Sequence, residues 1–259
     1  MPMMLDSNDE AEAIATPRAA HWGFWGTLVW GAVIAIIFVA LQIVTFAGVV
    51  LSRHDDLGRL SRSELEQVFS STANDGVAIS LMAFITTVVC GGLVVGVIKL
   101  KKGSILREYL CIKPVSLATI GRWLGLLLGL VAVLDTTTVV LGRSVVSEFG
   151  SMSYATASPV WMLWVAFVIA GPLFEELFFR GFLLRGFEAS FMGPIGAVVV
   201  TAVLWTANHL QYDAYELATV LCLGLLFGTA RLVTGSLVVP MALHAAANLV
   251  ATAEAAILR

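Results

Sequence analysis

Charge and cysteine are both scarce in this sequence, and each scarcity argues against a class of protein. Only 13% of the residues are charged, against about 25% in a typical soluble domain. No basic tract and no basic face interleaved with aromatic residues is present, which argues against a nucleic-acid-binding protein. The three cysteines lie far apart and form no CxxC pair, so the sequence indicates neither a disulfide framework nor a thiolate metal site.

Long apolar runs take the place of charge. Hydrophobic residues make up 59% of the 259-residue chain, and its mean hydropathy is +0.92. These runs predict an all-α fold, a polytopic helical bundle of about seven transmembrane helices. We expect one membrane domain, residues 24–258, preceded by a polar tail of residues 1–20. The predicted spans are residues 24–51, 76–100, 123–141, 159–187, 194–210, 217–233 and 236–258.

The distribution of basic residues predicts the orientation in the membrane. Seven spans put the two termini on opposite sides. Most of the 15 Lys and Arg residues face the cytoplasm if the N-terminus does, chiefly because of the basic connection at residues 99–122. We therefore expect a multi-pass membrane protein with a cytoplasmic N-terminus. We also expect its membrane to be a bacterial plasma membrane, although the charge distribution itself indicates only the orientation.

Glycines recur at every fourth position in two of the spans. Gly121, Gly125 and Gly129 accompany the third span, and Gly224 and Gly228 lie in the sixth. This spacing lines one helix face with small residues, so a neighbouring helix can approach closely. We expect close helix contacts at both places.

Two adjacent carboxylates and an arginine interrupt the fourth apolar run. Residues 160–174 contain no charged side chain, and Glu175, Glu176 and Arg180 then follow. Charges at this depth are costly and persist only when they are paired, hydrated or used. Glu176 and Arg180 are four residues apart and share a helix face, which predicts a structural ion pair. Glu175 is turned about 100° away and has no partner nearby in the sequence.

Further polar residues lie in the later spans. His209 ends the fifth run, and His244 and Asn248 are four residues apart on one face of the seventh. Each has an ordinary interpretation: a lone intramembrane histidine can hydrogen-bond a neighbouring helix, and a His–Asn pair can serve packing. Their concentration in the half of the chain that holds the two glutamates favours a shared site. Asp135, in the third span, has no visible partner, and its role stays open.

This set of residues suits the hydrolysis of an amide. A glutamate beside a histidine can activate water as a general base, and a second histidine with an asparagine amide can donate to a developing oxyanion. Alternatively, Glu175, His209 and His244 could hold one Zn²⁺ with an open position for water. The sequence leaves the cofactor open between none and one Zn²⁺. It contains neither HExxH nor a GxSxG serine motif.

The three motifs together resemble the CPBP family of CAAX-processing and bacteriocin-processing (Abi) intramembrane proteases, which includes type II CAAX prenyl endopeptidases. The motifs are Glu175-Glu176-x-x-x-Arg180, an aromatic residue four positions before His209, and His244-x-x-x-Asn248. The resemblance implies a four-helix catalytic core at residues 159–258, with residues 24–141 as accessory spans. It implies that Glu175, His209, His244 and Asn248 are catalytic, with Glu176 and Arg180 beside them.

One position departs from the family pattern. Trp205 stands where the family usually has phenylalanine. We interpret the larger ring as a change to the width of the substrate cleft rather than to the chemistry.

The function implied by the resemblance is that of an intramembrane endopeptidase. Its substrate would be a membrane-embedded or lipidated peptide or protein, and its surroundings the lipid bilayer. Two alternatives stay open. One is a proton-coupled or substrate-binding membrane protein with a buried Glu/His relay. The other is a non-catalytic immunity or scaffold protein that has kept the site.

Overall fold

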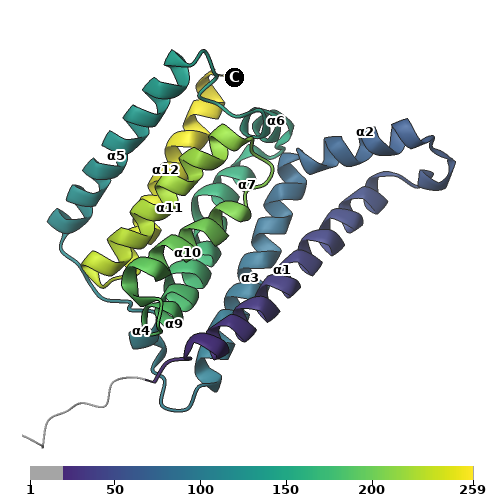
Figure 1. Cartoon of the computed structure of the whole chain (residues 1–259). Coiled ribbons are helices and arrows are strands. Elements are labelled where there is room, and N and C mark those ends of the chain that lie inside the picture. The colour runs from purple at the N-terminus through teal and green to yellow at the C-terminus, as the bar shows by residue number, and fades with distance from the viewer. Residues whose placement is uncertain (1–19, 259) are drawn as a thin grey trace, which may run out of the picture.

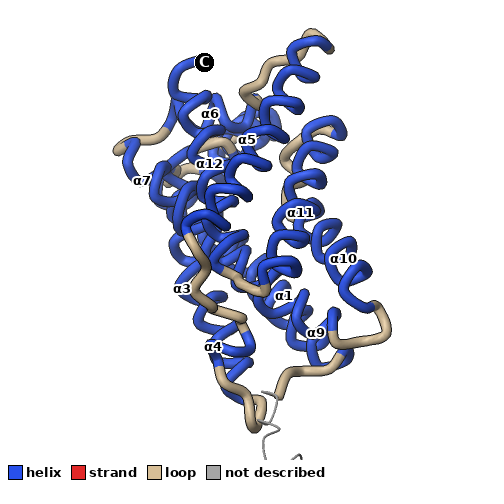
Figure 2. Tube along the Cα trace, turned by 90° about the vertical axis from the view of Figure 1, so that its left-hand side faces the viewer, coloured by secondary structure: helices blue, strands red, loops and turns tan. Residues whose placement is uncertain are grey.

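The computed structural model describes residues 20–258, and within that range the chain is helical, without strands. Figures 1 and 2 show long helices running side by side. The predicted all-α membrane bundle is confirmed. Nearly all of the predicted tail, residues 1–19, lies outside the described residues. The elements are α1 (Phe24–Arg53), η1 (Leu57–Arg59), α2 (Arg62–Ala73), α3 (Gly76–Leu100), α4 (Leu106–Tyr109), α5 (Leu117–Val140), α6 (Glu148–Thr156), α7 (Val160–Val165), η2 (Ala166–Ala170), α8 (Gly171–Glu175), η3 (Glu176–Leu183), α9 (Leu184–Glu188), α10 (Gly193–Ala207), α11 (Ala214–Thr234) and α12 (Val238–Leu258).

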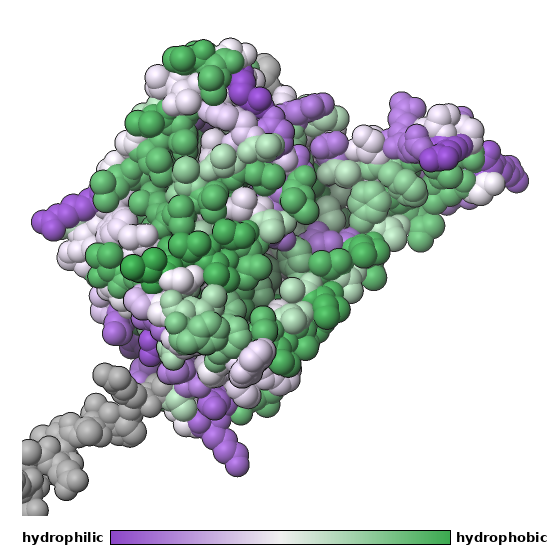
Figure 3. Space-filling model, in the orientation of Figure 1, coloured by the Kyte–Doolittle hydropathy of each residue, from purple (hydrophilic) through white to green (hydrophobic). Residues whose placement is uncertain are grey.

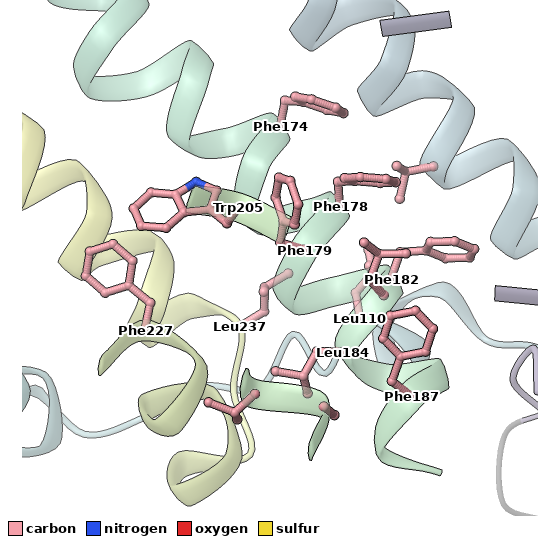
Figure 4. Close-up of a cluster of buried hydrophobic side chains, with 14 of the residues drawn as sticks. Leu110, Phe174, Phe178, Phe179, Phe182, Leu184, Phe187, Trp205, Phe227 and Leu237 are labelled. Carbon is pink, nitrogen blue, oxygen red and sulfur yellow. The ribbon is translucent and has the colours of Figure 1, made fainter. Parts of the chain in front are cut away.

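Within residues 20–258, six helices are long and apolar enough to cross a membrane. Five of them are single elements, and the sixth is the continuous helix Val160–Glu188, which runs from α7 to α9. Its apolar window is 44% buried, against 6% for α5. The helix that carries the two glutamates is therefore the most enclosed span, whereas α5 lies at the periphery. Figure 4 shows Phe178, Phe182 and Phe187 on one side of this helix and Trp205 with Phe227 on the other.

The fifth predicted span is shorter than the sequence suggested. We expected it to continue to Leu210, but α10 ends at Ala207 after 15 residues, about 22 Å at the usual rise. The backbone N–H of His209 donates to the Thr206 carbonyl at 2.9 Å, which is a tighter turn than the α-helical one. The prediction was wrong here, and His209 lies in the turn beyond the helix rather than on it.

The two sets of glycines behave differently. A Cβ built on Gly224 would lie 3.0 Å from the Trp205 ring, and one on Gly228 would lie 3.0 Å from Val198. The predicted close contact between α11 and α10 is therefore confirmed. The prediction for Gly121, Gly125 and Gly129 was wrong, because nothing lies within 4 Å of a Cβ at any of them. These three glycines all lie on α5, at a face that no neighbouring helix approaches.

The loops at the two ends of the bundle are tied by hydrogen bonds. At one end the backbone N–H of Leu237 donates to the Cys111 carbonyl at 3.0 Å, and the Ser236 hydroxyl donates to the Lys113 carbonyl at 2.7 Å. At the other end Arg143 pairs with Asp213. Apolar surface covers most of the face in Figure 3, with hydrophilic residues towards its margins. This pattern is the one expected of a multi-pass membrane protein.

Candidate active site

A cavity of about 560 Å³ opens beside the glutamate motif. Glu175 lines it, together with Trp205, His209 and Asn248. Each comes from a different place in the chain: the end of α8, α10, the turn after α10, and α12. His244 lies just behind, with its Nε2 3.9 Å from Glu175 Oε2. The structure thus brings together the four residues that the sequence proposed as catalytic.

The second glutamate lies behind the cavity rather than in it. Glu176 and Arg180 have no exposed side-chain surface, and their charged groups lie 2.9 Å apart. Arg180 also donates to the Gly224 carbonyl at 3.2 Å, and its guanidinium lies 4.6 Å from the centre of the Trp205 ring. The adjacent glutamates therefore have different surroundings. The side chain of Glu175 is 17% exposed, whereas Glu176 is enclosed.

Glu176 also determines that Nδ1 of His244 carries a proton. His244 Nδ1 lies 2.9 Å from Glu176 Oε1. An ionised carboxylate only accepts hydrogen bonds, so Nδ1 carries a proton and donates it. His244 Nε2 then faces Glu175. The ring is 2% exposed and stacks on Phe227 with the ring centres 5.2 Å apart, which restricts its orientation.

The turn after α10 orients His209. Its Nδ1 lies 2.9 Å from the Trp205 carbonyl, and because a carbonyl only accepts, Nδ1 is the protonated nitrogen. The other nitrogen is left as an acceptor. The imidazole stacks on Tyr212, with the ring centres 6.0 Å apart. Burial, with smaller contributions from Glu216 and Glu175, raises the pKa of Tyr212 to about 12, so the phenol stays neutral beside the histidine.

Asn248 supplies a hydrogen bond that is missing from a neighbouring helix because that helix contains a proline. In the π-helical stretch η2, the N–H of Gly171 donates to the Ala166 carbonyl, five residues back. The next N–H in that register is missing because residue 172 is proline. The carbonyl it would have reached belongs to Phe167, and Asn248 Nδ2 donates to that carbonyl at 2.8 Å. One of the two amide N–H groups is thus engaged and the other remains.

The alternative zinc site needs Glu175, His209 and His244 to converge. Among residues 20–258, no three His, Cys, Asp or Glu side chains gather closely enough to hold a metal ion. The side chains as they lie do not fit a His₂Glu site. Asp135 does not line the cavity.

Sequence reasoning missed two contacts of this site. Trp205 Nε1 donates a hydrogen bond to Glu175 Oε2, so the carboxylate that lacked a partner in the sequence has one in the fold. The second missed contact is the hydrogen bond from the Asn248 amide to the Phe167 carbonyl. Because Pro172 has no backbone N–H, the sequence could have indicated that a carbonyl one turn earlier lacks its helical partner. Nothing in the sequence indicated that Asn248 would donate to that carbonyl.

The fold and the site together define a class: a polytopic helical membrane protein with a buried Glu–Arg–His cluster beside a cavity. Residues 157–250 match the family model described as Type II CAAX prenyl endopeptidase Rce1-like. The resemblance drawn from the motifs is thereby confirmed, and this segment belongs to the CPBP/CAAX protease family.

One curated relative matches over part of its length. It is an uncharacterized 24.3 kDa protein of Escherichia coli, 31% identical over 126 residues, which are 46% of this chain. The match spans 58% of that relative. No solved structure matches this chain.

Removal of Arg180 should destabilise the protein. Arg180→Ala leaves Glu176 charged and enclosed, and breaking a buried pair typically costs about 3–5 kcal/mol. We expect a lower melting temperature in detergent, measured by tryptophan fluorescence. Arg185→Ala is the matched control, because its pair with Glu188 is partly exposed. An unchanged melting temperature with lost activity would place Arg180 in the chemistry instead.

Proposed function

We propose that this protein is an intramembrane endopeptidase in which Glu175 activates the attacking water. One observation carries the proposal. Of the two adjacent carboxylates, Glu176 is neutralised by Arg180 and enclosed, whereas Glu175 borders a cavity large enough for a peptide segment. A carboxylate in that position can take a proton from water while the water oxygen attacks the scissile carbonyl carbon.

The histidine of the turn assists the same water. With Nδ1 engaged by the Trp205 carbonyl, the other nitrogen of His209 is an acceptor, and it can receive a hydrogen bond from the water that Glu175 deprotonates. The proton taken by Glu175 then passes to the leaving amine. Atoms and charge balance without a further reactant.

His244 and Asn248 supply the donors for the oxyanion. Each has one polar hydrogen held by the protein, through Glu176 and the Phe167 carbonyl. The second N–H of Asn248 is available as it stands, whereas the second N–H of His244 requires a doubly protonated ring.

Loss of the Glu175 carboxylate should abolish cleavage. Glu175→Gln keeps the shape but removes the base, and general-base catalysis contributes about 10²–10⁴ in rate. We expect the turnover of a quenched lipopeptide in proteoliposomes to fall at least about a hundredfold, and His209→Ala to act in the same direction.

The control for this test is Glu64→Gln on α2, where glutamine can still serve the capping box that Glu64 forms with Ser61. Full turnover by Glu175→Gln would reject the mechanism. A proton relay without peptidase activity would show no cleavage in the wild type.

Metal removal should leave the activity intact. The proposed water activation uses only protein groups, because the three candidate ligands do not converge. Enzyme dialysed against a chelator should cleave at its original rate, and metal analysis should find well under one equivalent of zinc. Inactivation by the chelator, with recovery on adding Zn²⁺, would instead establish the metal-dependent alternative.

A second cavity supports a substrate with an apolar chain. About 370 Å³ in volume, it lies between α1 and the helix Val160–Glu188, and none of its lining residues is charged. Phe38, Phe174 and Asn208 line both cavities, so the apolar space adjoins the cavity that Glu175 lines. We infer that a lipid-modified or membrane-embedded peptide occupies the two together.

Filling the apolar cavity should discriminate between substrates. Ala35 lines it, so Ala35→Phe places a ring there. Excluding two methylene groups of a bound chain would cost roughly 1.6 kcal/mol, about tenfold in KM. We expect that rise for a lipidated peptide and little change for the same peptide without its lipid. Ile36→Phe, on the exposed face of α1, is the control. Equal effects on both peptides would contradict the assignment.

The orientation is also part of the proposal. A cytoplasmic N-terminus puts the basic connection between α3 and α5 on the cytoplasmic side. The short helix α10 begins at the same end of the bundle at which α9 stops. The bacterial plasma membrane remains the location that we propose.

A further inference from the structure

We propose that Trp205 is a positioning residue for the general base: its indole N–H holds one oxygen of Glu175 and leaves the other for water. This inference rests on the proposed function. It also reverses our interpretation of this position from the sequence, which assigned the larger ring to substrate fit.

The two oxygens of Glu175 have different surroundings. Oε2 accepts the hydrogen bond from Trp205 Nε1 and lies 3.9 Å from His244 Nε2. No hydrogen bond is found for Oε1 among the described residues. One turn earlier stands Gly171, where a Cβ would lie 3.8 Å from Oε1, so no side chain of that residue covers this oxygen. The carboxylate is thus anchored on one side and free on the other.

The indole itself has little freedom to move. Trp205 is 3% exposed and contacts both histidines, with ring centres 4.8 Å from His209 and 5.2 Å from His244. The guanidinium of Arg180 lies 4.6 Å from its centre. Gly224 of α11 also approaches the ring, so closely that a Cβ on this glycine would lie 3.0 Å from it. A ring held from several directions presents its N–H at one place.

The hydrogen bond does what packing alone cannot. Phenylalanine would fill much of the same space but has no N–H to donate. A hydrogen bond to an ionised carboxylate favours the ionised form, which is the form that accepts a proton from water. The indole N–H thus holds Oε2 of Glu175 in one place and leaves Oε1 for the water.

The decisive variant changes the N–H and little else. Replacing Trp205 by β-(3-benzothienyl)alanine substitutes sulfur for the N–H in a ring of nearly the same shape. A hydrogen bond to a charged group is worth about 1.5–3 kcal/mol, which corresponds to about one to two pH units. We expect the acid limb of the kcat/KM profile to move upward by about that amount, with KM changed less than about twofold.

Two further variants provide a second test and a control. Trp205→Phe should move the limb in the same direction, whereas Trp161→Phe, at an exposed tryptophan, should leave it unmoved. A merely structural role for Trp205 predicts less folded protein with an unchanged acid limb. An unmoved limb in folded benzothienylalanine enzyme would overturn the proposal.

A second measurement separates this inference from the proposed function. The indole N–H signal of Trp205, identified as the one absent from Trp205→Phe in ¹⁵N-indole NMR spectra, reports the hydrogen bond without any substrate. It should shift in Glu175→Leu, which removes the acceptor, and remain in place in Glu64→Gln. If the wild type cleaves nothing, the protease proposal fails while a shift still supports the contact. An unshifted signal in Glu175→Leu rejects the contact whatever the activity.

Discussion

The cost of burying charge governs this structure. A guanidinium inside an apolar bundle must be paired, and Arg180 meets Glu176 at 2.9 Å, a backbone carbonyl and the face of Trp205. Once Glu176 is committed to Arg180 and to His244, the adjacent Glu175 is the member of the pair without an arginine partner. The division between an enclosed, ion-paired glutamate and a glutamate that borders the cavity follows from having two acids and one arginine at this point.

The helix that carries both acids changes its register between them. Glu175 ends the α-helical segment α8, and Glu176 begins the π-helical segment η3. Widened turns of this kind are rare and occur frequently at functional sites. Here Glu175 faces the cavity and Glu176 faces the protein interior. The two adjacent residues therefore have different surroundings.

Local spacing made part of this site predictable. Glu176 with Arg180 and His244 with Asn248 are each four residues apart on a helix, so the sequence alone places each pair on one face. The bundle and most helix ends follow from the apolar runs. The hydrogen bond of Trp205 to Glu175 did not follow, because it depends on how closely α10 and α11 pack at Gly224. Likewise, a run of apolar residues does not reveal that α10 stops before His209.

The position of the Asn248 amide has a cause that only the fold supplies. Within a membrane every backbone polar group needs a partner, and Pro172 deprives the Phe167 carbonyl of the one that η2 would give it. Asn248 meets this need from α12, so one N–H is fixed to the backbone and the direction of the other is set with it. A donor held in this way is oriented before any substrate arrives, which is what oxyanion stabilisation requires. The same interruption of the helix therefore serves both its stability and the chemistry that we propose.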